Sequence, residues 1–116
     1  MAYQLLVDLH GCEEDYLNDI DCIKRIAQQS VAEIGAEIVE ECVHQFEPIG
    51  ISYIAVITTS HFSIHTWPEF GYAAIDIFSC KETIPEQLAQ QLKIAFDARE
   101  MEVQSVERKI QRDDLG

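Results

Sequence analysis

Four segments rich in β-branched and aromatic residues follow one another closely between residues 37 and 80. They cover residues 37–46, 51–59, 61–67 and 72–80, and their composition is typical of β-strands. Turn-forming residues separate them, such as Pro48 and Gly50 after the first segment and Pro68 after the third. Because a parallel pair needs a crossover of roughly a dozen residues or more, connections this short predict antiparallel pairing of neighbouring strands.

Two helices and two further strands are predicted around these four segments. Residues 3–9 and 101–110 have strand composition, and residues 16–34 have helical periodicity that ends at the cap residue Gly35. A second helix is expected to start at Thr83 or Ile84, with Pro85 in its first turn. The expected buried faces consist of Ile20, Ile23, Ala27, Val31 and Ile34 in the first helix, and of Leu88, Leu92, Ala95 and Phe96 in the second.

The predicted order of elements is β-α-β-β-β-β-α-β, within a single domain of residues 1–116. Two helices can cover only one face of such a sheet, so the sequence predicts an α+β fold. We expect a two-layer sandwich, with a mainly antiparallel sheet and two helices on one face. The other face must then meet solvent, a ligand or another subunit, and its aromatic residues favour dimerisation.

The charge balance argues against nucleic acid as a partner. Eight Lys and Arg residues stand against 21 Asp and Glu residues, which gives a net charge of −13, so phosphate backbones are repelled. No apolar run approaches the length of a membrane span, and Met1-Ala2-Tyr3-Gln4 lacks the basic start of a secretory signal. We therefore expect a cytoplasmic protein with no membrane partner. Its four scattered cysteines are expected to be free thiols.

Residues 59–72 carry most of the potential chemistry, with two serines, two histidines, a glutamate and a tryptophan. His61 and His65 would lie about 13 Å apart on a strand, too far to share one metal ion, so no metal site is predicted. Ser60 or Ser63 with His65 could form a hydrolase pair, although the nucleophile-elbow motif is missing. From the residues alone, a strand whose polar side chains carry no chemistry remains an open alternative.

The segment SHFSIHTWPEFGYAAIDIFSC, residues 60–80, resembles the core signature of the prokaryotic S-adenosylmethionine decarboxylase proenzymes. Residues 5–12 and the segment HQFEPIGIS, residues 44–52, are similar to two other parts of that family. The resemblance implies an α+β sandwich that cuts itself between residues 59 and 60 into a β chain, 1–59, and an α chain, 60–116. It also implies a covalent pyruvoyl cofactor made from the serine at the cut, S-adenosylmethionine as substrate, and a homodimer of processed protomers.

The resemblance further implies roles for individual residues. Ser60 corresponds to the serine that becomes pyruvoyl, His65 and Ser52 to residues that assist self-cleavage, and Cys80 to the proton donor in decarboxylation. Glu69 corresponds to a residue that binds the ribose hydroxyls, and Phe46 and Trp67 to aromatics near the nucleoside. These roles suit the chemistry, because no ordinary side chain can take up the charge left on the α-carbon when an amino acid loses CO₂.

The sequence departs from the family at the residue before the cleaved serine, which is Thr59 where glutamate is usual. Threonine is β-branched, so it is expected to crowd the carbonyl under attack and slow the cleavage. Two alternatives follow from the same residues. The first is a pyruvoyl-dependent decarboxylase of ornithine or arginine, and the second is an unprocessed homologue with a regulatory or binding role.

Overall fold

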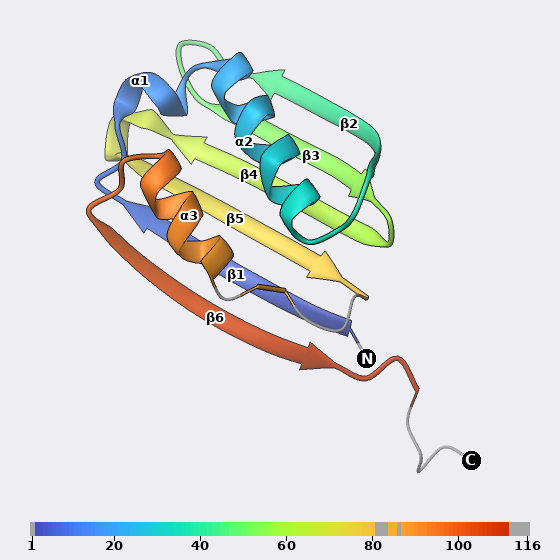
Figure 1. Cartoon of the computed structure of the whole chain (residues 1–116). Helices are drawn as coiled ribbons and strands as arrows, with labels where there is room; N and C mark the ends of the chain where they lie inside the picture. The colour runs from blue at the N-terminus through green and yellow to red at the C-terminus, as the bar shows by residue number, and fades with distance from the viewer. Residues whose placement is uncertain (1, 81–83, 86, 112–116) are drawn as a thin grey trace.

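A computed structural model describes residues 2–80, 84–85 and 87–111 of the chain. Its elements are β1 (Ala2–His10), α1 (Glu14–Leu17), α2 (Ile20–Glu33), β2 (Ile38–Gln45), β3 (Ile51–Ile57), β4 (Ser60–Trp67), the 3₁₀ turn η1 (Pro68–Phe70), β5 (Tyr72–Ser79), α3 (Gln87–Ala95) and β6 (Glu100–Arg108). The six strands form one sheet in the order β2-β3-β4-β5-β1-β6 (Figure 1). All its strand pairs are antiparallel, which confirms the predicted α+β class.

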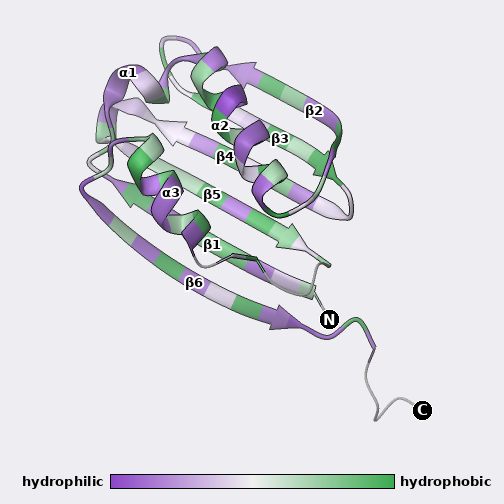
Figure 2. Cartoon of the chain, viewed as in Figure 1, coloured by the Kyte–Doolittle hydropathy of each residue, from purple (hydrophilic) through white to green (hydrophobic). Residues whose placement is uncertain are grey.

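Helices α2 and α3 lie on one face of the sheet, which we call the inner face (Figure 1). Alternate residues of the central strands point into this layer, such as Tyr53 on β3, Phe62 on β4 and Ile77 on β5, all 0% exposed. The alternation is visible as bands of opposite hydropathy along the strands (Figure 2). Because side chains along a strand alternate between its faces, the intervening residues lie on the opposite, outer face.

The predicted helix over residues 16–34 is divided in two. The side chain of Asp19 accepts a hydrogen bond from the Cys22 amide at 3.2 Å, so α2 starts with its own cap. Asn18 Oδ1 accepts a hydrogen bond from the Gly50 amide at 3.0 Å, which ties the break between the helices to the β2–β3 turn. The prediction of one continuous helix was therefore wrong at its N-terminal end, whereas Gly35 does follow the helix with φ of 72°.

The second predicted helix forms as α3, and its first residue is Gln87. The predicted start at Thr83 lies outside the described residues, and Pro85 precedes the helix and accepts a hydrogen bond from the Leu88 amide at 3.0 Å. Leu88, Leu92 and Phe96 are at most 1% exposed, which confirms the predicted buried face. No helix in the described part of the chain has the length and apolar character needed to cross a lipid bilayer.

Antiparallel pairing arranges the residues of the outer face in rows across the sheet. One row runs Val56, His61, Phe78, Gln4 and Val106, from β3 to β6. Val56 and Val106 are 49% and 42% exposed, so this face presents apolar side chains that nothing in the described part of the chain covers. Among the described residues no helix packs on it, as predicted from the number of helices (Figure 1).

Thr66 joins three elements through one buried hydroxyl. Its Oγ1 donates to the Leu17 carbonyl at 2.8 Å and accepts from the Ile51 amide at 2.9 Å, and the residue is 6% exposed. These bonds tie β4 to the end of α1 and to the start of β3. Thr66 faces the inner layer, so its neighbours His65 and Trp67 are held toward the outer face.

The Thr66→Val variant keeps the shape of the side chain but leaves two buried backbone groups without partners. We expect it to lower the free energy of unfolding by about 2–6 kcal/mol, since each of the two groups costs roughly 1–3 kcal/mol. Thr66→Ser keeps the hydroxyl and should cost only about 1 kcal/mol for its lost methyl group. Urea denaturation of both variants measures the difference, and equal losses would show that the hydroxyl contributes nothing.

Candidate functional site

Ser60 and Cys80 lie side by side where β4 begins and β5 ends. The Ser60 Oγ and the Cys80 Sγ are 3.7 Å apart, although 20 residues separate them in the sequence. The Cys80 amide also donates to the Thr59 carbonyl at 3.4 Å. Pairing between β4 and β5 produces this proximity, because Ser60 stands opposite Ser79, the residue before Cys80.

The backbone at Ser60 has an unusual conformation, with φ of 143°. An L-residue rarely adopts a φ this far on the positive side, because its Cβ then crowds the neighbouring backbone. Such conformations cost roughly 1–3 kcal/mol and persist only where surrounding contacts impose them. The unfavourable backbone conformation therefore lies at Ser60, next to the bond that the resemblance singles out for cleavage.

Cys80 is an exposed free thiol at the end of β5. Hydrogen bonding from the side chain of Thr59, and then from that of Ser60, lowers the pKa of this thiol below its usual range. By contrast, burial raises the pKa of Cys12 to about 11. A hydroxyl that donates to sulfur stabilises the thiolate, so proton exchange at Cys80 is easier than at an ordinary thiol.

Ser52 and His65 form a second pair, on the outer face. They stand opposite each other on β3 and β4, and the Ser52 Oγ lies 2.8 Å from His65 Nδ1. His65 also lines a hollow of about 320 Å³ on this face, together with the carboxylates of Asp8 and Asp76. The family resemblance implied one task for Ser52 and His65, and the fold brings the two side chains into direct contact.

Phe46, Trp67 and Glu69 lie at the other end of β3 and β4 from Ser60 (Figure 1). Phe46 follows β2 and is 47% exposed, and Trp67 ends β4 and is 41% exposed. Glu69 sits between Pro68 and Phe70 in the turn η1 and is exposed. Two aromatic faces and one carboxylate are thus open to a ligand at this end of the sheet.

One copy of the chain does not bring all the candidate residues together. At about 3.3 Å per residue, His65 lies roughly 16 Å along β4 from Ser60, and Trp67 lies roughly 23 Å away. The candidate site therefore consists of two parts. The cleavage end contains Thr59, Ser60 and Cys80, and the platform end contains Phe46, Trp67 and Glu69, with the Ser52–His65 pair between them.

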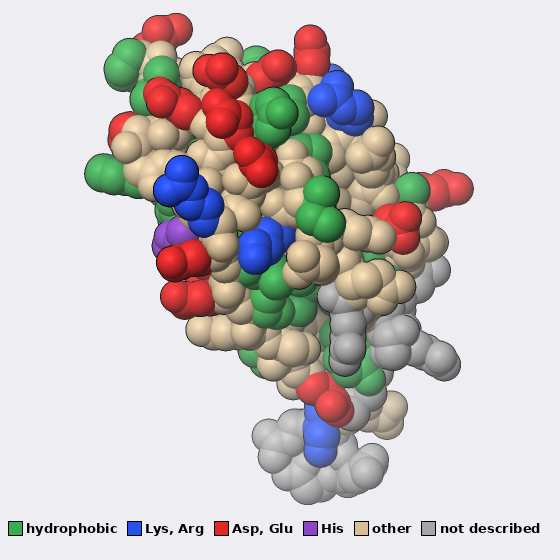
Figure 3. All heavy atoms as spheres, turned by 60° about the vertical axis from the view of Figure 1, so that its left-hand side comes forward, with side chains coloured by type: hydrophobic (Ala, Val, Ile, Leu, Met, Phe, Trp, Pro, Cys, Tyr) green, Lys and Arg blue, Asp and Glu red, His purple; other side chains and the backbone are tan. Residues whose placement is uncertain are grey.

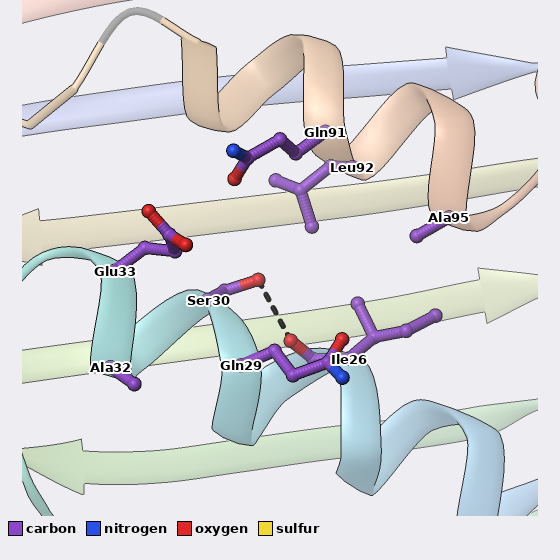
Figure 4. A pocket seen from close by; sticks show the side chains of 8 residues that line it. All are labelled: Ile26, Gln29, Ser30, Ala32, Glu33, Gln91, Leu92 and Ala95. Atoms are coloured by element: carbon purple, nitrogen blue, oxygen red, sulfur yellow. Dashed lines mark hydrogen bonds between the residues drawn. The ribbon is translucent and has the colours of Figure 1, made fainter.

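A hollow larger than the one beside His65 belongs to neither part. It is a groove of about 460 Å³ between α2 and α3, lined by Ile26, Gln29, Ser30, Ala32, Glu33, Gln91, Leu92 and Ala95 (Figure 4). The Ser30 hydroxyl in this groove donates to the Ile26 carbonyl at 2.8 Å, so it is already satisfied. The groove lies on the helical side of the molecule, away from the candidate residues.

Sequence reasoning missed several side chains around the platform end. Tyr72 lies against Trp67 with ring centroids 5.2 Å apart, and its hydroxyl donates to Asp8 at 2.5 Å. His44 contacts the Phe46 ring edge-on, with centroids 4.6 Å apart. Tyr72 lies on the outer face because side chains alternate along β5, but its contact with Asp8 depends on the register between β1 and β5, which the sequence pattern does not specify.

Comparison with known proteins agrees with this geometry. The family model described as S-adenosylmethionine decarboxylase matches residues 3–109. The S-adenosylmethionine decarboxylase proenzyme of Moorella thermoacetica is 41% identical over 93% of this chain and 87% of its own length. The proenzyme of Carboxydothermus hydrogenoformans is 40% identical over 93% of this chain and 86% of its own length.

A solved structure extends the likeness to three dimensions. The crystal structure of the adenosylmethionine decarboxylase from Aquifex aeolicus superposes with a TM-score of 0.86. It is 25% identical in sequence, and the match covers 97% of this chain and 94% of that one. With matches over nearly the whole chain in both sequence and fold, this protein belongs to the S-adenosylmethionine decarboxylase family.

Proposed function

We propose that this chain is a proenzyme that cuts itself between Thr59 and Ser60 and then decarboxylates S-adenosylmethionine. The fragments are residues 1–59 and 60–116, and the second begins with a pyruvoyl group derived from Ser60. Decarboxylated S-adenosylmethionine is an aminopropyl donor for polyamine synthesis. The observation that carries the proposal is the 3.7 Å approach of the Cys80 thiol to the Ser60 hydroxyl, in a chain of this family.

The self-cleavage takes place next to the unusual backbone conformation of Ser60. The Ser60 Oγ attacks the Thr59 carbonyl carbon, so that an ester forms and the amide C–N bond breaks. Elimination then releases Thr59 as a carboxylate and leaves an unsaturated residue 60. Water adds to that residue and ammonia departs, which leaves a ketone at the new N-terminus. An imidazole such as that of His65 is suited to these proton transfers at neutral pH.

In decarboxylation, the pyruvoyl group supplies a carbonyl-based sink for the electron pair left when CO₂ departs. The chain's own residues must then return a proton to the α-carbon. Cys80 is the candidate donor, because its thiol lies beside residue 60 and is exposed to a bound substrate. In the uncut chain, hydrogen bonds from the side chains of Thr59 and Ser60 lower the pKa of Cys80, so its thiol exchanges protons readily before the Ser60 hydroxyl is consumed.

The platform end suits a nucleoside with a positive charge. Trp67 and Phe46 offer aromatic faces to an adenine or a sulfonium cation, and the Glu69 carboxylate can accept two hydrogen bonds from ribose hydroxyls. The net charge of −13 favours a cationic substrate. Figure 3 shows carboxylates outnumbering the Lys and Arg side chains on the face that it displays.

A complete site requires a second copy of the chain. Because β4 holds Ser60 roughly 23 Å from Trp67, one copy cannot place both against a single small substrate. Two copies packed through their outer faces in antiparallel orientation would set the cleavage end of one against the platform end of the other. The exposed Ile54, Val56 and Val106 supply apolar surface for this contact. We therefore propose a homodimer with shared sites.

Two other functions have less support. A decarboxylase of ornithine or arginine would have no use for the nucleoside platform of Phe46, Trp67 and Glu69. An unprocessed regulatory homologue would have no need of the strained Ser60 or of the thiol beside it. We also place the protein in the cytoplasm, since all four cysteines are free thiols, as in a reducing compartment.

Intact mass under denaturing conditions tests the proposal directly. We expect purified wild-type protein to separate into fragments 1–59 and 60–116, and we expect the Ser60→Ala variant to remain one chain. After treatment with S-adenosylmethionine and cyanoborohydride, only the 60–116 fragment should gain mass. A single uncut mass for the wild-type protein would refute self-cleavage, and an adduct with ornithine or arginine alone would refute the substrate.

The pKa of Cys80 offers a second test, in precursor that cannot be cut. Ser60→Ala is expected to prevent cleavage, and Cys42→Ser removes the other exposed thiol. In this background, Thr59→Val keeps the side-chain shape but removes the hydroxyl that most lowers the pKa of Cys80. The pH midpoint of alkylation by iodoacetamide should therefore shift upward. Equal midpoints with and without the Thr59→Val substitution would show that this hydroxyl does not stabilise the thiolate.

Mixed dimers test whether the site is shared. A Ser60→Ala chain has an intact His65, and a His65→Asn chain has an intact Ser60. Each variant alone should cleave slowly or not at all, whereas co-expression should yield dimers in which the His65→Asn chain is cut. Intact mass identifies the cut chain. If the His65→Asn chain is cleaved no faster in the mixture than alone, His65 does not act across a subunit boundary.

A further inference from the structure

Tyr72 links the exposed Trp67 ring to a charged anchor on β1. It stands directly opposite Trp67 in the β4–β5 pairing, and the two ring centroids are 5.2 Å apart with planes tilted by 31°. Its hydroxyl donates to Asp8 Oδ1 at 2.5 Å. Its ring also stacks on His10, with centroids 5.1 Å apart and planes at 20°.

These contacts come from both strands beside β5. Trp67 belongs to β4, whereas Asp8 and His10 belong to β1, so Tyr72 is held from both sides. A ring fixed at its hydroxyl and supported on its face has little freedom to swing. The bond to Asp8, followed by burial, raises the pKa of Tyr72 to about 12, so the hydroxyl remains a donor at neutral pH.

The arrangement does not serve the hydrophobic core. Trp67 is 41% exposed, and the Asp8–Tyr72 bond lies on the outer face. A comparable bond exists on the inner face, where the hydroxyl of Tyr53 donates to Glu41 Oε2 at 2.7 Å. Tyr53 is 0% exposed and packs in the core, so its bond has an evident structural purpose. The Asp8–Tyr72 bond instead supports a ring that is exposed in a single copy of the chain.

We propose that Tyr72, anchored by Asp8, is a positioning residue that holds the Trp67 ring in place for the nucleoside of the substrate. This inference rests on the proposed function, because it assigns Trp67 to nucleoside binding. Holding the ring still before binding reduces the ordering that binding would otherwise require. The effect therefore falls on substrate affinity, and neither self-cleavage nor proton transfer depends on it.

The test compares Tyr72→Phe with the matched control Tyr53→Phe, each of which loses one hydroxyl bonded to a carboxylate. For Tyr72→Phe we expect KM for S-adenosylmethionine to rise about 3- to 10-fold with kcat changed less than about twofold, since lost uniform binding raises KM alone. Asp8→Asn should raise KM in the same direction, and adding it to Tyr72→Phe should raise KM little further, because both changes break one bond. Tyr53→Phe should lower stability and leave KM unchanged.

Trp67 is the only tryptophan in the sequence, so its fluorescence anisotropy reports the motion of this ring directly. It should fall in Tyr72→Phe and stay constant in Tyr53→Phe. Asp8→Asn carries the test if Tyr72→Phe does not fold. An unchanged KM and anisotropy in a variant that lacks the bond, with an active wild-type enzyme, would overturn the positioning role alone. A wild-type protein that is cut but does not turn over S-adenosylmethionine would overturn the proposed function and this inference with it.

Discussion

Everything in this molecule depends on the packing of two helices against one face of a six-stranded antiparallel sheet. The apolar sides of α2 and α3 cover alternate residues of the central strands, which fixes the face on which every other residue lies. Thr66 illustrates the consequence, because burying its hydroxyl in the inner layer turns His65 and Trp67 outward. The candidate chemistry is therefore confined to the outer face and to the two ends of the strands.

The stiffness of an extended strand then divides the site. β4 contains Ser60 at its start and Trp67 at its end, and no bending of a paired central strand can bring those positions together. The same sheet that aligns Ser60 with Cys80 keeps both away from the Ser52–His65 pair. Two copies packed through their outer faces would bring the two parts of the site together. The same contact would cover the apolar side chains that one copy leaves exposed.

Features that depend on local periodicity could be predicted from the sequence. Features that depend on contacts between residues far apart in the chain could not. The strands and the buried faces of the two helices were correct, because their periodicity is visible within each segment. The division between α1 and α2 was missed, since the Asn18 side chain at the break accepts a hydrogen bond from the Gly50 amide, 32 residues away. The closeness of Ser60 and Cys80 was implied only by family resemblance, and no pattern indicated the backbone conformation at Ser60 or the bond between Tyr72 and Asp8.

The contact between Thr59 and Cys80 gives the unusual residue before Ser60 a second effect. As a β-branched residue it is expected to crowd the carbonyl at the proposed cleavage site. Its hydroxyl also lowers the pKa of Cys80. The usual glutamate could not do this by hydrogen-bond donation, because an ionised carboxylate has no proton to donate. Under the proposed chemistry, cleavage turns the Thr59 carbonyl, now bonded to the Cys80 amide, into a carboxylate. A negative charge beside a thiol disfavours its ionisation, so the cut itself would help Cys80 to hold the proton that decarboxylation later requires.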